Sequence, residues 1–81
     1  MNKPKQMPDN FIDNASSYIS AIGIPCEPTG PRSISFPSGV SPSLFALLMK
    51  LASENDVRFL GIVRYLGMND NLELTAIFEP R

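Results

Sequence analysis

The C-terminal part of the chain carries charged residues that match one another across a β-hairpin. If Val57 to Glu79 folds back on itself, a single register places Arg58 opposite Glu79 and also Arg64 opposite Glu73. Two independent ion pairs therefore agree on one antiparallel alignment. The pattern constrains the fold more than any other feature, because the register of a hairpin decides which side chains share a face.

In this register both faces of the hairpin hold apolar residues. One face, which includes Phe59, Val63 and Phe78, is expected to meet the helices. A small sheet usually covers only one face with its own helices, so the outer face is a candidate contact surface, with an apolar centre and charged ends. The residues predicted to form this protein-interaction surface are Arg58, Leu60, Ile62, Arg64, Leu66, Glu73, Ile77 and Glu79.

Two other segments have apolar residues at helical spacing. The first helix is predicted over about residues 10–22, with Gly23 as its C-terminal stop. The second is predicted over about residues 42–55, with Ser41 as N-cap and Pro42 at its first position. The apolar arc of the second helix is wider than one face, so this helix is expected to contact both the sheet and the first helix.

The remaining segments complete the predicted order of elements. Residues 32–36 alternate polar and apolar side chains between two prolines, which favours a short strand at a sheet edge. Residues 24–31 contain three prolines and are predicted to form a rigid connector without regular structure. The hairpin strands are expected at 57–66 and 71–79, joined by a loop over 67–70, which we prefer to a two-residue turn.

The fold class that follows is α+β, a two-layer α/β sandwich of order α-β-α-β-β. Its three-stranded mixed sheet ends in a C-terminal antiparallel hairpin, and the first strand runs parallel to the second. The first strand could lie beside either strand of the hairpin. The first helix could lie on the inner face of the sheet or cross to cover the outer one.

Composition sets the broad class of the chain. Its 81 residues predict a disordered tail over 1–8 and a single α+β domain over 9–81. The formal net charge of −1 provides no broad field to attract nucleic acid or anionic membrane. The longest nearly continuous apolar segment, Leu44 to Ala52, is too short for a membrane span. Cys26 is the single cysteine and cannot form an internal disulfide, so we expect a cytoplasmic protein.

The residue types required for catalysis are sparse. The chain has no histidine, which removes the usual general base and the commonest metal ligand. Its carboxylates are scattered, and Cys26 lies beside Glu27, which disfavours a reactive thiolate. We therefore expect no enzyme, with no catalytic residue, cofactor or metal.

The sequence favours a small non-enzymatic interaction module that self-associates as a homodimer, or inhibits or regulates a protein partner, through the outer sheet face. A nucleic-acid-binding regulator that uses Arg58 and Arg64 is one alternative, although their glutamate partners would neutralise them. A sensor of small anions at residues 37–43, where the second helix begins, is another.

Overall fold

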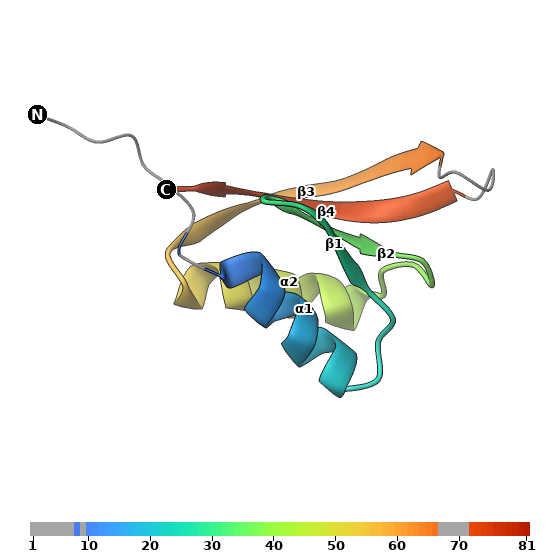
Figure 1. Ribbon diagram of the computed structural model, residues 1–81, viewed down its shortest axis with the longest axis horizontal. Coiled ribbons are helices and arrows are strands. Elements are labelled where there is room, and N and C mark those ends of the chain that lie inside the picture. The colour runs from blue at the N-terminus through green and yellow to red at the C-terminus, as the bar shows by residue number, and fades with distance from the viewer. Residues whose placement is uncertain (1–7, 9, 67–71) are drawn as a thin grey trace, which may run out of the picture.

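A computed structural model describes residues 8, 10–66 and 72–81 and shows a four-stranded sheet with two helices on one face (Figure 1). The α+β class is therefore confirmed. The predicted tail, apart from Pro8, and the predicted loop over 67–70 lie outside the described residues. In chain order the elements are α1 (Phe11–Ala21), β1 (Glu27–Gly30), β2 (Ser33–Phe36), α2 (Pro42–Glu54), β3 (Val57–Leu66) and β4 (Leu72–Pro80).

The predicted three-stranded mixed sheet is wrong in two respects. A further strand, β1, forms where an irregular connector was expected, so the order of elements is α-β-β-α-β-β. The sheet order is β1-β2-β4-β3, and every neighbouring pair is antiparallel. Because β1 is an edge strand, the missing N–H of Pro28 does not prevent pairing, and a bulge between Pro28 and Gly30 accommodates the local irregularity.

The position of β4 explains why no parallel pair exists. Both β2 and β3 run antiparallel to β4, so they point in the same direction, as a strand–helix–strand crossover predicts. They are not neighbours, however, because β4 lies between them. The question that the sequence left open is thus answered: β2 pairs with the last strand of the chain.

Local sequence signals account for the ends of both helices. The Ser41 hydroxyl accepts a hydrogen bond of 3.1 Å from the N–H of Leu44, and Pro42 begins α2. At the end of α1, Gly23 has φ +94° and its N–H donates to the Ser20 carbonyl, while the N–H of Ile24 donates to the Ile19 carbonyl. This is a Schellman motif, which glycine favours. No helix in the described part of the chain is long and apolar enough to cross a membrane.

The core lies between the sheet and the helices. Phe78 of β4 packs against Phe11 of α1 and Phe59 of β3, with ring centroids 5.3 Å apart in each pair. Phe59 in turn meets Phe45 of α2 at 5.1 Å. The four rings therefore join both helices to the hairpin. The buried apolar residues are Phe11, Ile12, Ala15, Ile19, Ile34, Phe36, Leu44, Leu48, Ala52, Val57, Ala76 and Phe78.

A β-bulge divides the hairpin into two registers. Arg58 lies opposite Glu79, as predicted, and their side chains form an ion pair of 2.8 Å. Between Phe59 and Gly61 the register shifts by one residue. Beyond this bulge the predicted pairing of Arg64 with Glu73 is wrong, because Arg64 lies opposite Leu74.

The register shift exchanges the two faces of β3. Ile62 pairs with Ala76 and packs against the core, although the sequence placed it on the outer face. Val63, expected to face the helices, instead lies opposite Thr75 with 48% of its surface exposed. The physical reason is the extra residue: one inserted position in a strand moves each later side chain to the other face.

The register shift predicts that truncations at two neighbouring positions differ in their effect on stability. We expect Ile62→Ala to lower the free energy of unfolding by about 2 kcal/mol, since it removes core contacts. We expect Val63→Ala to change it by less than about 0.5 kcal/mol, since Val63 is half exposed. Urea denaturation followed by circular dichroism measures both. A larger loss for Val63→Ala would contradict the bulge and support the uninterrupted register.

The bulge also depends on Gly61, whose φ is +130°. A Cβ at this position would meet no atom within 4 Å, so the cost of a side chain is conformational rather than steric. We expect Gly61→Ala to lower the free energy of unfolding by about 1–2 kcal/mol. Leu60→Ala, at the neighbouring exposed position, is the control and should cost less than about 0.5 kcal/mol in the same urea titration. Equal stability of Gly61→Ala and the native chain would show that the positive φ is not required.

Candidate interaction surface

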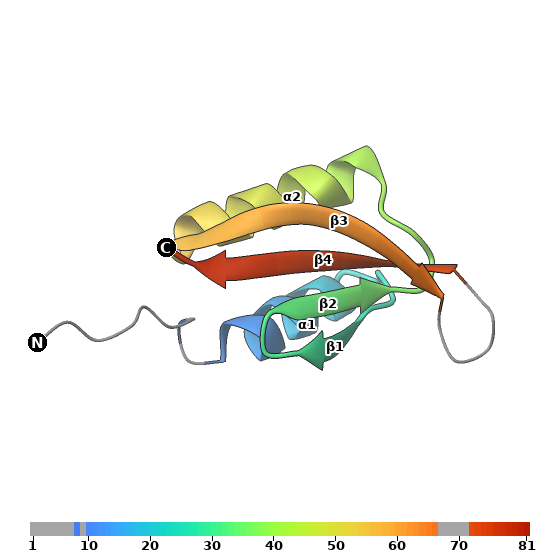
Figure 2. The ribbon, with the colours of Figure 1, turned by 90° about the horizontal axis from the view of Figure 1, so that it is seen from above.

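The outer face of the sheet is open. Both helices lie on the opposite face, with α1 against β1 and β2 and α2 against β3 (Figures 1 and 2). The first helix thus does not cross to cover the outer face, which was one of the two possibilities that the sequence allowed.

The centre of this outer face carries hydroxyl groups, where apolar side chains were expected. Ser35 of β2 and Thr75 of β4 lie directly opposite each other, and both are buried between their neighbours. The Ser35 hydroxyl donates a hydrogen bond of 2.9 Å to Oε2 of Glu73. The Thr75 hydroxyl is buried and has no hydrogen-bond partner within the described residues. The small polar centre makes this face a weaker candidate for apolar contact than the sequence suggested.

The unsatisfied Thr75 hydroxyl leads to a stability prediction. Valine has nearly the same shape and no hydroxyl to desolvate, so we expect Thr75→Val to raise the free energy of unfolding by about 1 kcal/mol. Ser35→Ala is the contrasting change and should lower it, because Glu73 loses its donor. Thermal and urea unfolding of the two variants test this difference. A destabilised Thr75→Val chain would mean that the hydroxyl is satisfied in solution.

The eight predicted surface residues do not form one surface. Ile77 is on the outer face with three charged residues, Ile62 and Arg64 have moved to the helix side, and Leu60 lies at the bulge. The side chain of Leu66 lies outside the described residues. The charged residues that do lie on the outer face are Arg58, Glu73 and Glu79.

Exposed apolar side chains gather instead at the β3 side of the molecule. Of the six large apolar residues that are exposed in the described part of the chain, two lie at α1, namely Tyr18 and Ile22. Three of the other four, Phe45, Met49 and Leu60, lie together between α2 and β3, whereas Val63 of β3 lies on the outer face opposite Thr75. The spacing of Phe45 and Met49 places both on one flank of α2. The wide apolar arc of α2 is therefore not fully covered by the first helix, contrary to expectation.

A groove of about 370 Å³ runs between this flank of α2 and strand β3. Figure 2 shows that α2 runs alongside β3 and extends past the edge of the sheet that β3 forms. The groove is lined by Phe45 and Met49 from the helix, Leu60 and Gly61 from the bulge, and Arg81 at one end. The bulge contributes directly, because it displaces Leu60 from the regular alternation of the strand.

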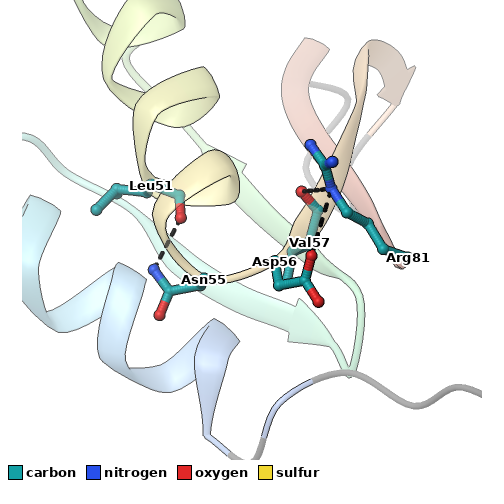
Figure 3. Close-up of polar contacts among 5 residues, drawn as sticks. All are labelled: Leu51, Asn55, Asp56, Val57 and Arg81. Atoms are coloured by element: carbon teal, nitrogen blue, oxygen red, sulfur yellow. Dashed lines mark hydrogen bonds and ion pairs between the residues drawn. The ribbon is translucent and has the colours of Figure 1, made fainter.

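Arg81 also lines the groove and lies beside Asp56 and Val57 at the start of β3 (Figure 3). Its Nε donates to the Val57 carbonyl at 3.4 Å and lies 3.9 Å from Oδ1 of Asp56. Pro80, directly opposite Val57, has no N–H to donate, so the Arg81 side chain supplies a donor there. Asp56 itself has φ +57°, which allows the tight turn from α2 into β3. In the same turn, Asn55 Nδ2 donates to the Leu51 carbonyl at 2.8 Å.

The outer edge of β3 has no strand beside it in the described residues. The strand is ten residues long and contains no proline or lysine, two of the features that usually protect an edge. Its bulge is a partial safeguard, since it interrupts the regular row of N–H and C=O groups. A free edge of this length beside an apolar groove can receive another polypeptide segment. Phe45, Met49 and Leu60, together with this edge, are called the β3 ledge.

The structure gives less support to the other candidate sites. Arg58 and Arg64 face opposite sides of the sheet after the bulge, so they do not form one basic patch. At the start of α2 the Ser41 hydroxyl is engaged by Leu44, as in an ordinary capped helix. Cys26 donates to the Ser16 carbonyl at 3.4 Å and lies 3.3 Å from the Ser20 hydroxyl, which suits a structural thiol. Within the described residues, no three metal-ligating side chains form a group.

Sequence reasoning missed Phe45, Met49, Val63 and Arg81 as surface residues. The signal for the first two was present in the wide apolar arc of α2, which was attributed to a helix contact. The signal for Val63 was Gly61, because a glycine within a strand often marks a bulge. No family model, no curated protein and no solved structure matches this chain. Its fold and surface alone therefore carry the functional inference.

Proposed function

We propose that this chain is a small non-enzymatic module that binds and regulates a protein partner through the β3 ledge. The observation that carries the proposal is the position of three exposed apolar side chains, Phe45, Met49 and Leu60, in one groove beside an unpaired strand edge. Exposed apolar residues scattered singly are ordinary, but a contiguous group beside free backbone groups is typical of a protein contact. The ledge replaces the outer sheet face as the proposed contact surface.

The residue content supports a binding role. The absence of histidine from the whole chain removes the side chain that most often transfers protons at neutral pH. The carboxylate of Glu79 is paired with Arg58, and that of Glu73 accepts a hydrogen bond from Ser35. A single cysteine without a disulfide partner suits a cytoplasmic setting for this binding.

The proposal predicts that peptides selected on the native chain depend on Met49. Random dodecapeptides displayed on phage can be selected against the immobilised chain, and the affinity of enriched peptides measured by fluorescence anisotropy. We expect Met49→Glu to weaken binding at least tenfold, because it introduces a charge into the apolar groove. Tyr18→Glu on α1 is a matched control, because Tyr18 is 52% exposed and Met49 is 54% exposed. This control variant should change the affinity less than twofold.

Two results would contradict the proposed function. One is a selection in which no peptide is enriched above the background of an empty support. The other is a set of peptides that binds the native, Met49→Glu and Tyr18→Glu chains equally. Because both side chains are exposed, we expect each variant to keep the native fold. Circular dichroism of each variant checks this.

A further inference from the structure

The β3 ledge combines two surfaces, a strand edge and the flank of a helix. The edge of β3 offers backbone donors and acceptors in the plane of the sheet. The flank of α2, with Phe45 and Met49, extends past this edge on the helix side of the sheet (Figure 2). A strand added to the edge would therefore lie over α2, and every second side chain of that strand would point at the groove.

The bulge shapes the groove for a side chain of the incoming strand. Gly61 has no side chain, and no atom lies within 4 Å of where its Cβ would be. Open space at this point allows a neighbouring segment to approach the backbone closely. Leu60, Met49 and Gly61 all line the groove, so an apolar residue that enters it is contacted from both the strand and the helix.

The charges along the ledge specify a further property of the segment. No carboxylate among the described residues lies within ion-pair distance of Arg64, which the bulge placed opposite Leu74 instead of Glu73. Arg64 is exposed on the same side of the sheet as Ile62 and therefore on the side of the groove. A carboxylate on the incoming strand, about four residues from the apolar side chain, would lie beside Arg64.

We infer that the partner contributes an extended segment that pairs with β3 as a fifth strand. One apolar side chain of the segment packs between Met49 and Leu60, and one carboxylate pairs with Arg64. This inference rests on the proposed function, for which it supplies the binding mode and the chemistry of the partner. The affinity would come from main-chain hydrogen bonds and the specificity from the two side chains.

A second copy of the chain does not fit the same site. In a continuous sheet made by two antiparallel β3 edges, the helices of both copies lie on one face. Because α2 extends past β3 (Figure 2), the α2 helices of the two copies would be brought against each other on that face. The other edge, β1, has four residues and includes Pro28, which makes it a poor strand to add to β3. A separate, slender segment meets neither obstacle.

A pair of methylated peptides tests strand addition. The probe is a synthetic ten-residue peptide that alternates threonine and valine, with one phenylalanine and a glutamate four residues from it. N-methylation of alternate residues removes the amide donors on one edge of the extended peptide, and shifting the pattern by one residue removes those on the other. We expect one pattern to weaken binding at least tenfold in fluorescence anisotropy and the shifted pattern to change it less than twofold.

The ion pair is tested with the same probe. Arg64→Ala should weaken binding of the glutamate peptide about threefold to tenfold, and should have no effect on a peptide with glutamine in its place. Arg58→Ala, on the other face of β3, is the matched control and should leave both affinities unchanged. Equal losses for both peptides would overturn the role of Arg64.

The outcomes separate the binding mode from the proposed function. If selected peptides depend on Met49 but both methylation patterns bind as well as the parent, strand addition is wrong and the interaction module stands. If neither the selected peptides nor the probe distinguishes Met49→Glu from the native chain, the proposed function fails as well. A dimeric mass in light scattering that Met49→Glu makes monomeric would assign the ledge to a second copy and overturn the inference.

Discussion

The structure depends on Phe59 and Ile62 facing the same side of the sheet although they are three residues apart. In a regular strand, side chains alternate, so residues three apart face opposite ways. The bulge between Phe59 and Gly61 inserts the one residue that reconciles them. Without it, either the aromatic contact of Phe59 or the core contact of Ile62 would be lost. The hairpin register, the faces of β3 and the position of Leu60 all follow from this requirement.

The aromatic residues show what the bulge preserves. Phe59 is the link between Phe78, which contacts α1 through Phe11, and Phe45 of α2. Edge-to-face and tilted pairs of this kind each stabilise a fold by about 0.5–1.5 kcal/mol beyond the area they bury. In so small a core, contacts between elements far apart in sequence form much of the margin of stability. The strain that Gly61 accommodates is offset by keeping this chain of rings intact.

Features encoded within a few residues could be predicted from the sequence, and features set by tertiary contact could not. Both helices were predicted to within about a turn because Ser41, Pro42 and Gly23 act through local backbone geometry. The pair of Arg58 and Glu79 was predicted correctly because Arg58 precedes the bulge, where the predicted register still holds. Strand β1 was missed because Pro28 reads as a breaker, and only its place at the sheet edge makes it tolerable. Val63 was misplaced because core packing, not the local pattern, selects the bulged register.

The two halves of the chain have the same arrangement, a helix followed by a hairpin, but their edges differ in a way that bears on function. The N-terminal half ends the sheet with β1, whose four residues include Pro28 and a bulge. Those features protect an edge from unwanted pairing. The C-terminal half ends it with β3, which has ten residues and no proline. If neither edge of the sheet had a binding role, we would expect both edges to be protected against pairing with another strand. The exposed apolar flank of α2 lies beside the open edge alone, which is the asymmetry that a single binding site requires.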